Sequence, residues 1–263
     1  MHDFAFVFAG FAVGLVVGLT GVGGGSLMTP LLIFFFGIKP HLAIGTDLLF
    51  AAFTKLGGTV SLARTRMVDW KIVGQTAAGS IPASLLTLYI LHIVGPASPA
   101  AHAAMTTTLG VALLLTATAM LYKAVYGKAA PRDIARADLH AATQARHWAL
   151  PLLFGAVIGS LVTLTSVGAG AIGVIVLMLL YPALPLPRIV AADIAHAVPL
   201  TLVAGLGHAS IGSVDWVLLA KLLAGSLPGI WLGSRLVNST PDRWIRSLLS
   251  LLLAYAGAKL IAI

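Results

Sequence analysis

Residues 68–82, VDWKIVGQTAAGSIP, recur in altered form as residues 214–228, VDWVLLAKLLAGSLP. Both stretches begin with Val-Asp-Trp and end with Ala-Gly-Ser-x-Pro, and they are displaced by 146 residues (214 − 68). Asp47 has a counterpart at the same displacement, Asp193 (193 − 47). The chain therefore contains two related halves, which is the sequence sign of a protein built from internal structural repeats.

The repeat extends upstream into the glycine-rich start of each half. There the displacement is 145 residues (155 − 10), one fewer than further along. The matched residues are Gly10, Gly14, Thr20, Val22, Gly23 and Gly25 in the first half and Gly155, Gly159, Thr165, Val167, Gly168 and Gly170 in the second.

The composition is that of an integral membrane protein. Hydrophobic residues make up 59% of the 263 residues and charged residues only 9%, whereas a soluble domain carries about 25% charged residues. Backbone groups in lipid must be hydrogen-bonded internally, so the long apolar runs predict an all-α polytopic fold. Ten apolar segments follow one another along the chain, at residues 4–20, 26–37, 41–62, 71–92, 102–126, 148–165, 170–184, 189–211, 215–237 and 243–262.

The arrangement of these segments predicts two inverted-topology repeats. We expect a first transmembrane repeat over residues 1–126, a cytoplasmic connector over 127–147 and a second repeat over 148–263. Five segments in each half is an odd number, so the second half runs inverted to the first. With the connector inside, most basic residues near segment ends also lie inside, as the positive-inside rule requires. These residues are Arg64, Arg66, Lys71, Arg188, Arg235, Arg243 and Arg246.

Glycine clusters interrupt both halves just before the two shortest segments. Glycine costs about 1 kcal/mol relative to alanine inside a helix, so we expect breaks that leave backbone N–H groups available to an anion. Inverted halves would bring both breaks near the membrane midplane, where secondary transporters bind substrate. The regularly spaced glycines upstream are expected only to let helices pack closely. The predicted anion cradle comprises Thr20, Gly21, Gly23, Gly24, Gly25, Ser26, Thr165, Ser166, Gly168 and Gly170.

Of the ionisable residues within the apolar segments, four are candidate functional residues, because charge is costly there. Lys55 lies near the middle of its segment and is expected to attract an anion, or alternatively to pair with Asp47 or a backbone carbonyl. Its counterpart in the second half is Thr201. Asp47 and Asp193 are candidates for proton coupling or, equally, for tethering the glycine breaks. His196 follows Asp193 by three residues, on the same helix face, and is a third coupling candidate.

Other residues carry structural predictions. Asp69 and Asp215 are expected to be helix N-caps. His208 lies near a segment end and is expected at the membrane interface, with Asp215 as its candidate partner. The sequence has no cysteine and no metalloprotease, nucleotide-binding or hydrolase motif. We therefore expect no enzymatic activity, metal, cofactor or nucleic-acid partner.

The chain resembles the sulfite exporter TauE/SafE family over nearly its whole length. The resemblance rests on GLTGVGGGSL at residues 18–27, Pro30, AIGTD at residues 43–47 and GSLPG at residues 225–229. The family's glycine motif carries over to the first break, and more weakly to the second, where Ala169 replaces the middle glycine.

This resemblance implies a secondary transporter of the bacterial inner membrane. Its expected activity is export of sulfite, an organosulfonate or a related small anion by alternating access without ATP hydrolysis, with protons or sodium as candidate coupling ions. A passive anion channel that uses the same cradle as its filter is the alternative. An intramembrane enzyme with Ser160 or Ser166 near His196 is the third hypothesis.

Overall fold

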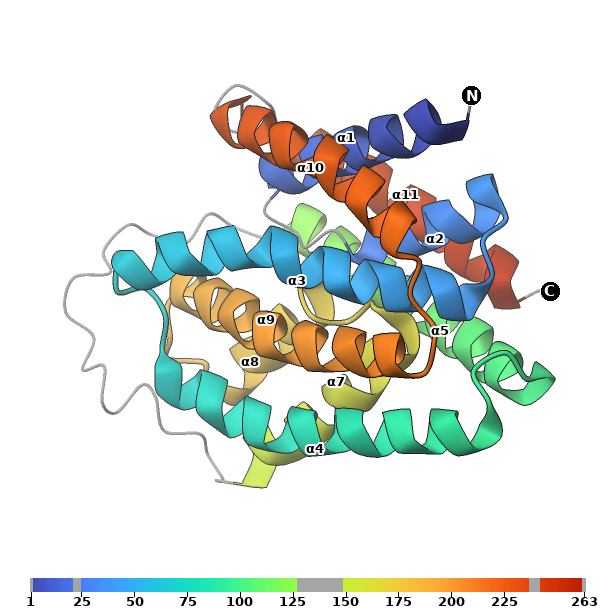
Figure 1. The fold of residues 1–263 in the computed structure, drawn as a ribbon. Coiled ribbons are helices and arrows are strands. Elements are labelled where there is room, and N and C mark those ends of the chain that lie inside the picture. The colour runs from blue at the N-terminus through green and yellow to red at the C-terminus, as the bar shows by residue number, and fades with distance from the viewer. Residues whose placement is uncertain (1, 21–24, 127–148, 237–241, 262–263) are drawn as a thin grey trace.

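A computed structural model describes residues 2–20, 25–126, 149–236 and 242–261 of the chain (Figure 1). Over these residues all regular secondary structure is α-helical, and each helix corresponds to one of the ten predicted segments. The connector 127–147 lies outside the described residues. The helices are α1 His2–Thr20, α2 Gly25–Phe36, α3 Pro40–Arg64, α4 Trp70–Val94, α5 Pro99–Tyr126, α7 Ala149–Thr165, α8 Ala171–Leu180, α9 Leu186–Ser210, α10 Trp216–Leu236 and α11 Asp242–Ile261.

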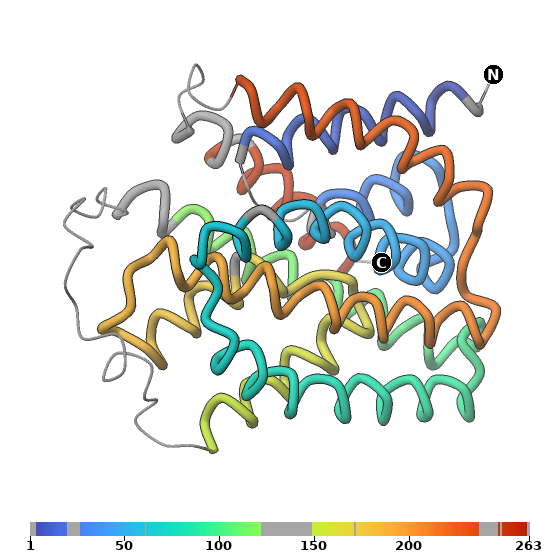
Figure 2. The backbone as a smooth tube through the Cα atoms, turned by 60° about the vertical axis from the view of Figure 1, so that its left-hand side comes forward, coloured from blue at the N-terminus to red at the C-terminus, as the bar shows by residue number. Residues whose placement is uncertain are grey.

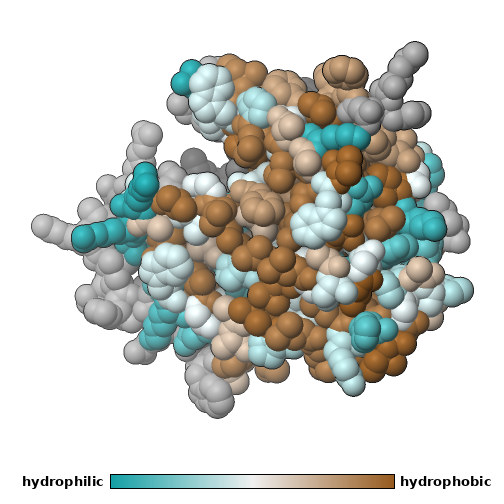
Figure 3. Space-filling model, viewed as in Figure 1, coloured by the Kyte–Doolittle hydropathy of each residue, from teal (hydrophilic) through white to brown (hydrophobic). Residues whose placement is uncertain are grey.

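The helices have the lengths and surfaces of a multi-pass membrane protein. Within the described ranges, four helices are long and apolar enough to cross a bilayer: α4, the Pro99–Leu121 part of α5, α9 and α10. Large hydrophobic side chains such as Phe4, Phe35 and Leu179 are exposed, and Figure 3 shows hydrophobic residues spread over much of one face. So much exposed apolar surface is expected where lipid is the solvent.

The strongest helix contacts join the two halves of the chain. Helix α1 lies along α10, α4 lies along α7, α3 lies along α9, and α5 lies along α11 (Figures 1 and 2). The short helices α2 and α8 pack on α3 and α9, respectively. Helices α3 and α9 therefore form the centre of the structure, between the α1–α10 pair and the α4–α7 pair.

Glycines let the α1–α10 and α4–α7 pairs approach to backbone contact. A Cβ added at Gly14 would lie 2.4 Å from the Ser226 carbonyl oxygen, and one added at Gly159 would lie 2.2 Å from the Ser80 carbonyl oxygen. No side chain fits at such distances, so the prediction that the spaced glycines serve helix packing is confirmed. The other glycines in these two interfaces are Gly10, Gly18, Gly79, Gly155, Gly225, Gly229 and Gly233.

The predicted N-caps are also confirmed. The Asp69 carboxylate accepts hydrogen bonds from the backbone N–H groups of Lys71 (3.1 Å) and Ile72 (3.3 Å) at the start of α4. The Asp215 carboxylate accepts one from Leu218 N–H (2.9 Å) at the start of α10. Both caps satisfy donors that a helix start leaves without intrahelical partners.

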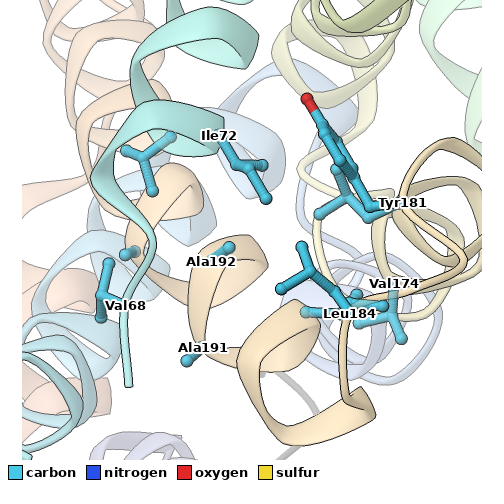
Figure 4. Close-up of a cluster of buried hydrophobic side chains, with 11 residues drawn as sticks. Val68, Ile72, Val174, Tyr181, Leu184, Ala191 and Ala192 are labelled. Carbon is cyan, nitrogen blue, oxygen red and sulfur yellow. The ribbon is translucent and has the colours of Figure 1, made fainter. Parts of the chain in front are cut away.

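A hydrophobic cluster holds the short helix α8 against α4 and α9. Ile72 comes from α4, Val174 from α8, and Ala192 from α9, while Tyr181 and Leu184 come from the α8–α9 connection (Figure 4). The Tyr181 hydroxyl also donates a hydrogen bond to the Gln75 side-chain oxygen on α4 (3.0 Å). These contacts fix the position of α8 and hence of the helix break that precedes it.

Candidate functional site

The candidate site lies between α3 and α9, which run antiparallel. At one end of the pair, a Cβ on Gly45 would lie 3.0 Å from the His208 Cβ. Towards the other end, the Thr59 hydroxyl donates to the Ile194 carbonyl oxygen (3.5 Å). Residues near the middle of α3 therefore face residues near the middle of α9.

Asp47 binds α3 to the short helix α2. Its side chain is fully buried, and its Oδ2 atom accepts a hydrogen bond from the Thr29 hydroxyl. The Oδ1 atom has no hydrogen-bond partner among the described residues. Ser166, from the α7–α8 break, lies close to the same carboxylate without a hydrogen bond to it. Asp47 thus connects the short helix of the first half with the break of the second.

Asp193 has the matching position in the second half. Asp193 is 3% exposed. A Cβ atom added at Gly173 would lie only 1.9 Å from its Oδ1 atom. Gly173 belongs to the first turn of α8. Each aspartate therefore lies against an early turn of the short helix in its own half, and at Gly173 only glycine leaves room for the carboxylate.

Lys55 lies near both carboxylates. Its side chain is 8% exposed, and its ammonium group interacts electrostatically with both Asp47 and Asp193. The Nζ atom also donates a hydrogen bond to the Ala169 carbonyl oxygen (3.3 Å), within the α7–α8 break. A buried lysine is costly unless it is paired, and here two carboxylates and a carbonyl provide that pairing.

His196 joins the same cluster from α9. Its Nε2 atom forms a 2.8 Å hydrogen bond with the hydroxyl of Ser80 on α4. The imidazole also interacts electrostatically with Lys55. The structure thus gathers the predicted residues Asp47, Lys55, Asp193 and His196 around a single buried region.

The second helix break is held open by unusual backbone conformations. Ser166 has φ +60°, while Gly168 and Gly170 have φ +127° and +134°. Only glycine adopts such values without strain, so Ser166 carries a strained conformation. The Ser166 hydroxyl is buried without a hydrogen-bond partner among the described residues. The Thr165 hydroxyl is used locally, because it accepts from Val167 N–H (3.0 Å) and donates to the Leu161 carbonyl (2.6 Å).

The first break is described only at its edges. Helix α1 ends at Thr20 and α2 begins at Gly25, followed by Ser26. The predicted cradle residues Gly21, Gly23 and Gly24 lie outside the described residues.

The prediction for His208 is wrong. The side chain is fully buried rather than interfacial, and its Nε2 atom bonds to the Thr163 carbonyl oxygen on α7 (2.9 Å). Asp215 caps α10 instead of pairing with it. The turn after α9 folds back, with Ser213 N–H bonded to the His208 carbonyl (2.8 Å), and α3 packs there at Gly45, so the helix end is covered.

Two partners in the site were not anticipated from the sequence. Thr29 binds Asp47, and Ser80 binds His196. Ser80 does lie within the repeated Ala-Gly-Ser-x-Pro motif, so its recurrence was a usable signal. Thr29 lies outside any repeated motif that we identified.

The sequence profile of the sulfite exporter TauE/SafE family matches residues 6–260. The chain belongs to this family. It is 38% identical to the probable membrane transporter protein YjnA of Bacillus subtilis, over 97% of this chain and 98% of the relative. It is 29% identical to the probable membrane transporter protein YdhB of the same organism, over 95% and 97%. No solved structure matches significantly. Membership of this family and these relatives make the protein a membrane transporter.

Proposed function

We propose that this protein is a secondary transporter that exports a small anion across the bacterial inner membrane, without ATP hydrolysis. The anion is sulfite or an organosulfonate, in keeping with the family description. The observation that carries the proposal is Lys55, an ammonium group buried beside the α7–α8 break. A buried cation next to the non-helical backbone of a helix break is suited to binding an anion.

The break supplies a second attraction for an anion. Helix α8 begins after Gly170 without a side-chain cap, and its N-terminus carries partial positive charge. Lys55 bonds Ala169 in this same break. An oxyanion that replaced the Ala169 carbonyl would accept hydrogen bonds from Lys55 while facing the positive end of α8. Sulfite and sulfonates offer three oxygens for such contacts.

The helix contacts support the proposed inverted repeats. If α1 to α5 correspond to α7 to α11, then the α1–α10 contact corresponds to the α7–α4 contact, and both are glycine-lined. Exchanging the two halves maps the α3–α9 contact onto itself, and it does the same for the α5–α11 contact. This is the pattern expected when a two-fold axis relates the halves. Alternating access would then follow from movement of the α3–α9 region, with its short helices, against the outer pairs.

Flux measurements test the proposal. Purified protein in liposomes is tested with sulfite, sulfoacetate and thiosulfate, and wild type is compared with Lys55→Ala. We expect saturable flux and counterflow of one of these anions, both lost in Lys55→Ala. The matched control is Lys71→Ala, which removes the same charge from an exposed position at the start of α4.

Each alternative interpretation predicts a different result in these flux measurements. Flux that rises linearly with concentration and shows no counterflow identifies the channel. Saturable transport that persists in Lys55→Ala removes Lys55 from the site. No flux of any of the three anions, from protein that remains folded, refutes the substrate class while the membrane transporter assignment stands.

A further inference from the structure

The net charge of the buried cluster makes it unfavourable for an anion to enter without a cation. Asp47 and Asp193 surround one lysine, Lys55, while the imidazole of His196 is hydrogen-bonded to Ser80. With a neutral imidazole and the other groups ionised, the cluster carries one negative charge. A further anion in a buried region of that charge is strongly unfavourable unless a cation accompanies it.

Asp47 is the carboxylate equipped to take up that cation as a proton. It is fully buried, and only one of its two oxygens has a hydrogen-bond partner among the described residues. The Ser166 hydroxyl is also buried without a partner and interacts with Asp47. The Ser166 hydroxyl can donate to Oδ1 when Asp47 is ionised and accept from it when Asp47 is protonated, so this pair accommodates both protonation states of Asp47.

The surroundings of Asp47 agree with this role. The groups that face it are Thr29 from α2, Lys55 from its own helix and Ser166 from the α7–α8 break. When Lys55 turns to an incoming anion, Asp47 loses its charged partner while still desolvated, which favours the neutral carboxylic acid. Asp193 differs, because its carboxylate lies against Gly173 and has further interactions.

We infer that Asp47 is the coupling residue, which binds one proton from solution for each monovalent anion that binds Lys55. The anion and the proton then leave together on the other side, so the transport cycle moves no net charge and export follows the outward gradient of the anion. This inference rests on the proposed anion transport. Because binding is reciprocal, protonation of Asp47 also raises the affinity for the anion.

The experiment uses methanesulfonate, an anion that stays singly charged over the working pH range, so any proton moved is carried by the protein. In liposomes containing wild-type protein, a pH gradient is expected to drive methanesulfonate accumulation. A potassium diffusion potential at equal pH is expected to drive none. Asp47→Asn keeps an oxygen for Thr29 but holds no exchangeable proton. We expect it to lose the response to the pH gradient while retaining methanesulfonate exchange at equal pH.

Controls separate this inference from the proposed function. Asp69→Asn is the matched control, because it makes the same change at a helix N-cap outside the cluster, where asparagine also caps a helix. It is expected to keep pH-driven accumulation. The inference is overturned if a pH gradient drives methanesulfonate accumulation in Asp47→Asn. It is also overturned if the membrane potential drives accumulation in wild type. In both cases the proposed anion transport stands. If wild type moves neither methanesulfonate nor any of sulfite, sulfoacetate and thiosulfate, the substrate proposal fails instead.

A spectroscopic measurement tests Asp47 without transport. Infrared difference spectra of wild-type protein, taken with and without methanesulfonate, are expected to show a protonated carboxylic acid that Asp47→Asn lacks. If wild type shows no such band at any pH at which it is folded, Asp47 is not the proton carrier.

Discussion

Close packing of α1 on α10 predicts that a single methyl group at Gly14 destabilises the protein. A Cβ there would lie 2.4 Å from the Ser226 carbonyl oxygen and 2.7 Å from the Ser226 Cα. Both are backbone atoms, so no side-chain rotation relieves the clash. The helices must separate by roughly 1 Å to restore ordinary contact, and such a gap forfeits a quarter to a half of the local dispersion energy.

The size of the effect follows from two opposing contributions. Overpacking of this kind costs about 1–3 kcal/mol, while alanine favours the helix over glycine by about 1 kcal/mol. We therefore expect Gly14→Ala to lower the free energy of unfolding by about 1 kcal/mol, and by about 2 kcal/mol at most. Gly159→Ala, at the α7–α4 contact, is expected to act in the same direction.

Gly74→Ala is the matched control, because a Cβ on this α4 residue has no atom within 4 Å. It is expected to leave stability unchanged or to raise it by up to about 1 kcal/mol. The measurement is unfolding by SDS in mixed micelles, followed by circular dichroism. If Gly14→Ala is as stable as wild type, or if Gly74→Ala is destabilised equally, the glycines do not determine the contact.

Two further predictions concern hydrogen bonds around the short helices. Thr29→Val removes the donor to Asp47 and should lower the free energy of unfolding by about 1–3 kcal/mol, whereas Thr29→Ser keeps the hydroxyl. Equal stability of these two variants in the same SDS titration contradicts the contact. Burial, and then the charge of Asp69, raise the pKa of Tyr181 from 10.0 to about 12. Because the folded protein holds the Tyr181 proton more tightly than the unfolded chain, Tyr181 contributes to the free energy of unfolding. This contribution is fully present below pH 10 and is lost as the pH rises through about 12. Tyr181→Phe should remove this alkaline loss, and an unchanged pH profile of unfolding would show that Tyr181 does not cause it.

The helices could be predicted well from the sequence because hydropathy and glycine positions determine where a membrane helix begins and ends. The largest difference is at α8, which ends at Leu180, although the predicted segment ran to residue 184. Pro182 lies two residues further on and disfavours a helical conformation at Tyr181, which is the C-cap. Leu184 remains apolar because it fills the cluster between α4 and α9 rather than because it is helical.

The site could be predicted in part. Lys55 and the two aspartates were identified because charge inside an apolar segment is rare, and the repeat matched Asp47 with Asp193. Their hydrogen-bond partners depend on which faces of distant helices meet, as with Thr29 and Asp47. Neither the periodicity of the apolar residues nor helix propensity predicts which faces meet. His208 shows the same limit, since only the tertiary fold reveals that α3 and the turn after α9 cover it.

The pairing of α1 with α10 has a consequence for biosynthesis. Helix α1 is synthesised long before α10, yet its glycine face fits this later helix, which begins at Trp216. During membrane insertion, α1 must therefore remain in the lipid with that face unpaired until most of the chain has left the ribosome. Its insertion and its final assembly are separate events in time. A prematurely terminated chain would expose the glycine face to lipid or to membrane quality-control proteases.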